Sequence, residues 1–205
     1  MMLKIVRASR NPKKIRELET FLEEIPSDKS IMSLDDIGFH EDIAEDGNTF
    51  KENSLIKASV PARLGFIGVA DDSGLEVDAL DGAPGVWSAR YSGEGANDEK
   101  NNKKLLEALR GVPAEKRTAR FRTVVTCVFP DGSSFSTEGS CEGRILEAPD
   151  GGGGFGYDPL FFFEPLGKTF ASMTPEEKNA VSHRGKAMRE FARRFSEELK
   201  ARGSN

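Results

Sequence analysis

The sequence is poor in the residues that mark several protein classes. Of its 205 residues, two are cysteine, two are histidine and one is tryptophan. Cys127 and Cys141 lack CxxC spacing, which excludes a structural zinc site, and we expect both to be reduced thiols packed in strands. No apolar run is long enough to cross a membrane, and no signal-peptide segment follows Met1. We therefore expect a cytoplasmic protein without a membrane partner.

Basic charge is not in excess. The chain has 29 Lys and Arg against 34 Asp and Glu, a net charge of -5, which disfavours a partner that is a nucleic-acid polymer. The charges are unevenly spread, because residues 4–16 are rich in Lys and Arg and residues 35–52 are rich in Asp and Glu. An acidic segment close to a basic one could bind a metal together with an anionic substrate. Alternatively, both segments could simply be solvated surface.

Glycine is abundant in two stretches. Of 21 glycines, seven lie in residues 65–95 and eight in residues 132–156. Glycine is favoured where the backbone turns tightly or approaches a ligand closely. These stretches mark two candidate functional loops, with ordinary turns of a β-rich protein as the alternative.

Hydrophobic spacing predicts alternating strands and helices. Asn11 and Pro12 fit the cap and first position of a helix. A second predicted helix ends near Pro61, and the strand 66–70 is expected to end in a turn at Asp71-Asp72-Ser73-Gly74. The expected elements are strands 3–8, 66–70, 75–77, 119–129, 133–145 and 160–163, and helices after 11, over 49–60, over 97–109 and after 174. Strands 119–129 and 133–145 form a hairpin around Pro-Asp-Gly. The fold class is α/β, a mixed β-sheet with flanking helices.

The last helical segment has two interpretations. Thr174-Pro175-Glu176-Glu177 fits a capping box, and Val181, Met188 and Phe191 continue at helical spacing. One helix could run through the whole segment. Alternatively, Ser182 could cap a new helix whose first turn contains His183 and Arg184.

Two segments combine residues suited to phosphate and metal chemistry. Ser9 to Lys14 lies where a strand meets a helix, and free amides with a nearby lysine at a helix N-terminus bind anions. Asp71 and Asp72 end an apolar run, and because adjacent strand residues face opposite sides, only one can point into a given cleft. With Glu45, that aspartate could hold a hard divalent cation or take a proton from water. A plain cap and a plain turn are the alternatives.

A third segment suits a nucleobase. Gly151 to Gly154 precede Phe155-Gly156-Tyr157-Asp158, which combines an aromatic face and a carboxylate with flexible backbone. Lys178, His183 and Arg184 follow as hydrogen-bond donors, although His183 could equally lie on a basic helix surface.

Six ordered segments carry a resemblance to a known family. They are Ser9-x-Asn11-x-x-Lys14; Glu45 with Thr49-Phe50-x-Glu52-Asn53; Ala70-Asp71-Asp72-Ser73-Gly74-Leu75; Gly82-Ala83-Pro84-Gly85-Val86-Trp87-Ser88-Ala89-Arg90-Tyr91; Gly154-Phe155-Gly156-Tyr157-Asp158-Pro159; and Ser182-His183-Arg184-Gly185. In this order they resemble the inosine triphosphate pyrophosphatase family, over nearly the whole chain. Two positions depart from the usual pattern: Ser9-Arg10-Asn11 replaces Thr-Gly-Asn, and Trp87 replaces a commoner Tyr.

The resemblance implies an activity, a cofactor and an assembly. It implies hydrolysis of ITP, dITP and XTP to the monophosphate and pyrophosphate with Mg²⁺, by a homodimer. It implies that residues 1–205 form one two-lobed domain around a central active-site cleft.

The resemblance also implies residue roles. Asp72 would be the catalytic base, and Glu45 and Asp72 the metal ligands. The implied substrate contacts are Ser9, Arg10, Asn11, Pro12, Lys13, Lys14, Lys57, Ser73, Phe155, Gly156, Tyr157, Asp158, Lys178, His183 and Arg184.

The residue chemistry is consistent with this specificity. Hypoxanthine and xanthine present an acceptor oxygen at position 6 where adenine presents an amino group, so Lys, His and Arg donors favour the oxo bases. Two alternatives remain at this stage: a Maf-like pyrophosphatase acting on pyrimidine or modified triphosphates, and a catalytically silent nucleotide-binding module.

Overall fold

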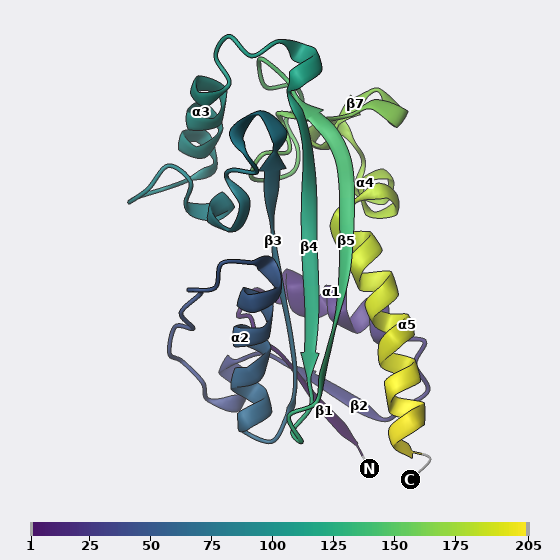
Figure 1. The fold of residues 1–205 in the computed structure, drawn as a ribbon. Helices are drawn as coiled ribbons and strands as arrows, with labels where there is room; N and C mark the ends of the chain where they lie inside the picture. Colours follow the sequence, from purple (N-terminus) through teal and green to yellow (C-terminus); the bar gives the residue numbers. More distant parts are fainter. Residues whose placement is uncertain (1, 204–205) are drawn as a thin grey trace. The chain divides into compact units, whose positions relative to one another are not determined.

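A mixed β-sheet with flanking helices forms the protein, as expected (Figure 1). The computed structural model describes residues 2–203. Its seven strands are ordered β2-β1-β3-β4-β5-β6-β7. The strands are β1 Leu3–Arg7, β2 Lys29–Met32, β3 Ile67–Val77, β4 Thr118–Val128, β5 Ser134–Ile145, β6 Phe161–Phe163 and β7 Lys168–Thr169. The helices are α1 Pro12–Leu22, α2 Phe50–Arg63, α3 Asp98–Ala108, α4 Pro175–Val181 and α5 His183–Gly203.

The chain divides into two compact units. Unit 1 comprises residues 1–72, 124–138 and 187–205, and unit 2 comprises residues 73–123 and 139–186. Strands β3, β4 and β5 and helix α5 contribute residues to both units. A single two-lobed domain around a central cleft stays a prediction.

Unit 1 is built on parallel strands. Strand β1 pairs in parallel with β2 and with β3, in the register Ile5 to Ile31 and Ile5 to Ile67. The apolar spacing of the first helix buries Leu18 and Leu22 completely, and they pack with Val69 and Phe191 in one core. Asn11 caps α1 with Pro12 in its first turn, so this local prediction is confirmed.

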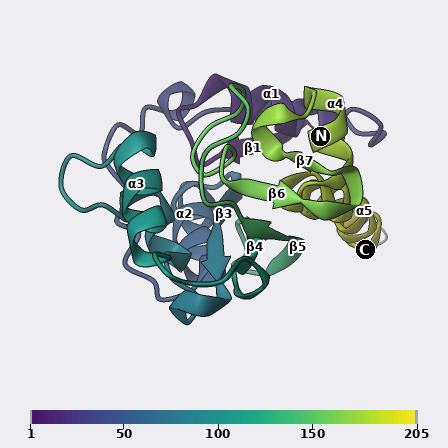
Figure 2. The ribbon, with the colours of Figure 1, turned by 90° about the horizontal axis from the view of Figure 1, so that it is seen from above.

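Unit 2 has its own, aromatic core. Phe121, Phe161 and Phe170 lie with ring centroids 4.7–5.7 Å apart, beside the buried Leu105 of α3. Strands β6 and β7 pair antiparallel (Figure 2). Asn97 caps α3, which agrees with the predicted helix to within one residue at each end.

Strand β3 corrects the sequence prediction. The Asp71-Asp72-Ser73-Gly74 segment lies within one continuous 11-residue strand and not in a turn. Asp and Gly are depleted in strands, but strand preference is dominated by packing and pairing. Here Asp71 is buried and contacts Arg7 of the neighbouring strand, which supplies a partner for a carboxylate inside the sheet.

Two helix boundaries also differ from expectation. Helix α2 continues through Pro61 to Arg63. A proline this close to the C-terminal end costs the helix one i to i−4 hydrogen bond, and only two helical residues follow it. The C-terminal segment is two helices, since Ser182 has an extended ψ of 152° between α4 and α5. The Ser182 hydroxyl accepts a hydrogen bond from the Gly185 amide at 3.1 Å, so the capping alternative is confirmed.

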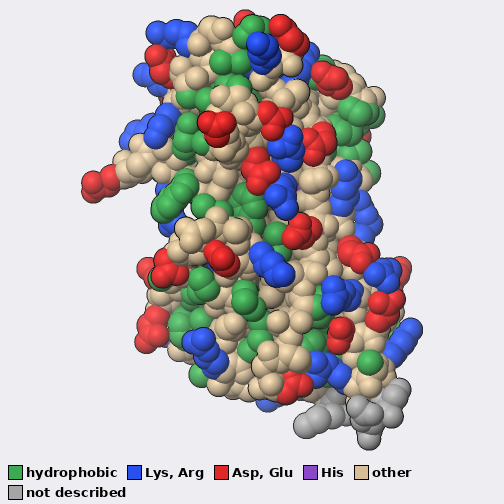
Figure 3. All heavy atoms as spheres, viewed as in Figure 1, with side chains coloured by type: hydrophobic (Ala, Val, Ile, Leu, Met, Phe, Trp, Pro, Cys, Tyr) green, Lys and Arg blue, Asp and Glu red, His purple; other side chains and the backbone are tan. Residues whose placement is uncertain are grey.

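Both cysteines are buried and unoxidised, as predicted. Among residues 2–203, we find no helix with the length and apolar character needed to cross a membrane. On the face shown in Figure 3, the described Lys and Arg side chains are interspersed with Asp and Glu.

Candidate active site

The connection from β1 to α1 is organised by its own side chains. The Asn11 side-chain oxygen Oδ1 accepts a hydrogen bond from the Lys13 backbone amide at 2.9 Å, and the Ser9 hydroxyl accepts one from the Asn11 backbone amide at 3.1 Å. Pro12 starts the helix, and Lys13 is exposed beside it. The amides of Lys13 and Lys14 are thus satisfied within the connection. The positive end of the α1 dipole, together with the exposed Lys13, is what suits this helix start to an anion.

Arg10 does not add its charge to that helix start. Its guanidinium contacts Asp35 at 3.2 Å and Asp42 at 3.4 Å, and it donates to the Glu41 carbonyl at 2.8 Å. The acidic segment predicted from the sequence is therefore a partner of Arg10. This pairing holds residues 35–42 against the β1–α1 connection.

Asp71 and Lys14 form a second contact in the same unit. The Lys14 amine lies 3.2 Å from both carboxylate oxygens of Asp71, which also contacts Arg7. Asp71 is buried, and Arg7 is completely buried. The contact fixes the position of the Lys14 amine at the sheet, while about a third of its side chain stays exposed.

Asp72 lies in a separate set of contacts with α2. The Lys57 amine is 2.6 Å from Glu45 and 3.4 Å from Asp72. The Asn53 amide donates to Asp72 at 3.1 Å and its oxygen accepts from the Gly47 amide at 2.9 Å. Adjacent strand residues thus have different partners, as the alternation of a strand requires. We call Glu45, Asn53, Lys57 and Asp72 the α2 cluster.

Burial raises the pKa of the Asp72 carboxyl above its usual value of 3.8. Lys57 and the hydrogen bond from Asn53 oppose this rise in pKa, whereas nearby Glu45 adds to it. A carboxylate with a raised pKa is a better proton acceptor than an exposed one. Asp72 therefore has the electrostatic character of a general base.

Close packing brings α2 to β3. Thr49 and Glu52 form a capping box, which fixes the start of α2. A Cβ at Gly68 would lie 1.9 Å from the Ala58 carbonyl oxygen, so only glycine permits this approach of helix to strand. Ala58 follows Lys57 directly, and the contact thereby sets the distance between Lys57 and Asp72.

The glycine-rich segment of unit 2 forms a loop with one exposed ring. Gly154 and Gly156 have left-handed φ values of 77° and 60°. The Phe155 ring is 73% exposed, whereas Tyr157 is buried and donates its hydroxyl to the Ser88 carbonyl at 2.8 Å. Asp158 is also buried, and it accepts from the Phe155 amide at 2.8 Å. Phe155 is thus the member of this loop with a free aromatic face.

Lys178 and His183 both lie against phenylalanine rings of unit 2. The Lys178 amine contacts Asp158 and lies 4.7 Å from the Phe155 ring centroid and 5.4 Å from that of Phe170. The His183 ring stacks on Phe121 at 4.8 Å. Arg184 follows, half-buried, in the first turn of α5. The residues predicted to contact the nucleobase, which we call the base-side residues, therefore all lie in unit 2. They are Phe155, Gly156, Tyr157, Asp158, Lys178, His183 and Arg184.

The contacts gather the predicted residues into two sets. Unit 1 contains the Ser9–Lys14 segment, Glu45, Lys57 and Asp72, and unit 2 contains the predicted base-side residues. Ser73 directly follows Asp72 and is exposed in β3.

Several contacting residues were missed from the sequence. Arg7 supports Asp71, and Asn53 supports Asp72. Asn53 lies in one of the six matched segments, which could have indicated it. Arg7 has only a weak signal, a charged residue at the end of an apolar strand.

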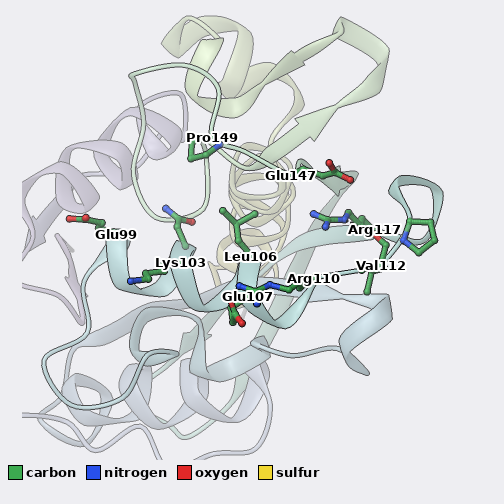
Figure 4. Close-up of a pocket in the computed structure, with 12 residues that line it drawn as sticks. Glu99, Lys103, Leu106, Glu107, Arg110, Val112, Arg117, Glu147 and Pro149 are labelled. Atoms are coloured by element: carbon green, nitrogen blue, oxygen red, sulfur yellow. Dashed lines mark hydrogen bonds and ion pairs between the residues drawn. The ribbon is translucent and has the colours of Figure 1, made fainter.

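A separate pocket lies beside α3 in unit 2 (Figure 4). It has a volume of about 740 Å³, and its lining includes Leu106, Arg110, Arg117 and Pro149. The lining contains none of the predicted substrate residues. We therefore do not place the chemistry there.

Fold and contacts together define a class of protein. An α/β sheet whose strand and helix ends carry carboxylates, amines and the positive end of a helix dipole is suited to a phosphorylated ligand. The sequence profile of the Ham1 family matches residues 5–194. The chain belongs to the Ham1 family, and the resemblance seen in the sequence is confirmed.

Relatives and solved structures agree with this assignment. A dITP/XTP pyrophosphatase of Geobacter sulfurreducens is 52% identical over 91% of this chain and 94% of its own. One of Syntrophobacter fumaroxidans is 51% identical over 96% and 83%. The structure of the Staphylococcus aureus Ham1 protein superposes with a TM-score of 0.89 at 37% identity, covering 95% of this chain and 99% of its own. These matches favour the purine interpretation over the Maf-like alternative.

Proposed function

We propose that this protein hydrolyses non-standard purine nucleoside triphosphates, ITP, dITP and XTP, to the nucleoside monophosphate and pyrophosphate. The observation that carries the proposal is the α2 cluster, in which a carboxyl with a raised pKa lies beside a second carboxylate and a lysine. The names of the relatives support the same substrates. A silent binding module would have no need of a buried base beside phosphate-binding cations.

Asp72 is the proton acceptor in this proposal. Water attacks phosphorus in the anhydride between the α- and β-phosphates, the phosphorus–oxygen bond to pyrophosphate breaks, and Asp72 takes the proton of the attacking water. Lys14, Lys57 and the positive end of the α1 dipole stabilise the negative charge that develops on the phosphate oxygens. Ser9, Asn11, Pro12 and Lys13 shape that helix start, and Arg10 holds it against the acidic segment.

Glu45 and Asp72 fit a divalent cation. Magnesium is commonly bound by one or two carboxylates together with substrate phosphates, and these two carboxylates contact the same lysine amine. Among residues 2–203, no group of three or more acidic, His or Cys side chains is placed to hold a metal, so phosphate oxygens would complete the coordination. Mg²⁺ would neutralise phosphate charge, and Lys57 would then be released to contact phosphate.

The base-side residues divide by their contacts. Phe155 provides the exposed ring on which a base stacks, and Lys178, His183 and Arg184 provide donors to an oxygen at position 6. Tyr157 and Asp158 support the loop through Ser88 and Lys178, and Gly156 allows its turn. Ser73, which is exposed next to Asp72 in β3, contributes a hydroxyl contact to the substrate.

The cellular setting completes the proposal. We propose one functional domain made of both units, a cytoplasmic homodimer, and a nucleotide as partner in place of a nucleic-acid polymer.

A substrate panel tests the activity. With Mg²⁺, the protein should release pyrophosphate from dITP, ITP and XTP, and much less from dATP, dTTP or UTP. Pyrophosphate and orthophosphate are measured separately. Stepwise release of orthophosphate, or a preference for pyrimidine triphosphates, would reject the proposed function.

Arg184 tests the specificity. Because the guanidinium would donate to the oxo group of the base, Arg184→Ala should lower the ratio of kcat/KM for ITP over ATP by about tenfold or more. Lys186→Ala is the matched control, because Lys186 is exposed two residues further along α5. An unchanged ratio in Arg184→Ala would remove Arg184 from the base site.

A further inference from the structure

The first two turns of α3 hold both backbone polar groups of one glycine in the exposed loop. The Asp98 carboxylate accepts a hydrogen bond from the Gly156 amide at 2.7 Å. The Asn102 side-chain amide donates to the Gly156 carbonyl at 2.9 Å. Asp98 and Asn102 are four residues apart, which places them on the same face of the helix. We call this pair of contacts the α3 clamp.

Gly156 is a position where such support has an effect. Its φ of 60° is in the left-handed region, and no other atom would lie within 4 Å of a Cβ there, so nothing packs against that side of the residue. On one side of it Tyr157 and Asp158 are buried, and on the other Phe155 is 73% exposed. The α3 clamp is therefore a second link between a fixed part of the loop and the exposed ring, beside the hydrogen bonds that join the Phe155 backbone to Asp158.

Helix α3 is itself well fixed. Leu105 and Leu109 are fully buried, and the buried Asn101 donates to the Ala89 carbonyl at 3.1 Å and accepts from the Ser92 amide at 2.8 Å. A rigid helix can therefore transmit its position to the loop through two hydrogen bonds.

We propose that Asp98 and Asn102 are positioning residues for the nucleobase, which hold the Phe155–Gly156 backbone in the conformation that receives it. This inference rests on the proposed function, because it assumes that Phe155 stacks on the base. Holding the loop before binding reduces the ordering cost of the complex. Loss of the clamp therefore weakens binding of substrate and transition state alike, which raises KM and leaves kcat nearly unchanged.

The surroundings of α3 allow clean substitutions. Asn102 lines the pocket of Figure 4 together with Leu106, so a leucine side chain at position 102 has space beside an apolar neighbour. Asp98 is exposed. Asp98→Ala removes the acceptor, whereas Asp98→Asn retains an acceptor oxygen without the charge. Glu99→Gln and Lys103→Gln are matched controls, because each lies one residue along α3 from a clamp residue.

Steady-state kinetics with dITP test the inference. Asp98→Ala and Asn102→Leu should each raise KM about fivefold to tenfold with kcat within about twofold of wild type. Asp98→Asn should recover most of the loss, and the controls should match wild type. Wild-type KM in both clamp variants, or loss confined to kcat, would overturn the inference. A wild-type protein that does not hydrolyse dITP would instead reject the proposed function.

Amide hydrogen exchange tests the clamp without turnover. The Gly156 amide should exchange at least about tenfold faster in Asp98→Ala than in wild type, while amides of β4 keep their protection. Loss of β4 protection would show a general folding defect, and Asn102→Leu then provides the second variant. Unchanged Gly156 exchange in a folded Asp98→Ala protein would overturn the clamp even if KM rose.

Discussion

Replacement of Asp72 by asparagine should lower kcat for pyrophosphate release from dITP by about 10²–10⁴-fold, the usual contribution of a general base. The amide is nearly the same size as the carboxylate but cannot accept the proton of the attacking water. It is also a poorer ligand for a divalent cation. The measurement is steady-state release of pyrophosphate at saturating Mg²⁺.

The same substitution should not destabilise the fold. Burial raises the pKa of Asp72, so the folded state holds this proton more tightly than the unfolded chain does. Asp72 therefore contributes to the free energy of unfolding at low pH, where its carboxyl is protonated. This contribution is lost as the pH rises from 3.8 through the pKa of Asp72 in the folded state. At neutral pH the buried charge opposes folding, and Asp72→Asn removes it. We therefore expect a melting temperature equal to or above that of wild type.

Asp46→Asn is the matched control for Asp72→Asn. Asp46 is an exposed carboxylate of the acidic segment next to Glu45, so its loss should leave both kcat and stability unchanged. Activity within tenfold of wild type in Asp72→Asn would reject Asp72 as the base. Unfolding of that variant at neutral pH would contradict the electrostatic argument.

Local signals in the sequence predicted local structure well. Asn11, Thr174 and Ser182 were each indicated as helix caps, and each accepts a hydrogen bond from a backbone amide of the following turn. Such contacts span two or three residues, so the sequence contains all the partners. The apolar spacing alone fitted one continuous helix from residue 174 onward equally well. The cap at Ser182 distinguishes the observed pair of helices from that continuous helix.

Non-local partners explain what the sequence did not show. The Asp71–Gly74 segment reads as a turn because its composition is unfavourable in a strand, yet Arg7 provides a partner 64 residues away. Tyr157 and Asp158 belong to a predicted base segment, but the structure buries both. The contact of Asp98 with Gly156 joins residues 58 apart, and no spacing pattern indicates it.

Gly68→Ala should be strongly destabilising. The added Cβ would lie 1.9 Å from the Ala58 carbonyl oxygen and 2.9 Å from the Pro61 ring, and neither neighbour is the flexible end of a side chain. Helix α2 must therefore move away from β3, at a cost in unfolding free energy of about 3 kcal/mol. Urea denaturation measures this loss. Gly152→Ala is the control, because that glycine has no neighbour within 4 Å of the added atom and no left-handed φ.

The displacement should also lower activity in molecules that remain folded. Lys57 precedes Ala58, and its amine is only 2.6 Å from Glu45 and 3.4 Å from Asp72, so a shift of α2 disturbs both contacts. Misplacement of about 1 Å in a catalytic array can cost about 100-fold in rate. We expect kcat for dITP to fall at temperatures well below the transition. Wild-type kcat in a destabilised Gly68→Ala protein would show that the spacing of α2 and β3 is required for folding alone.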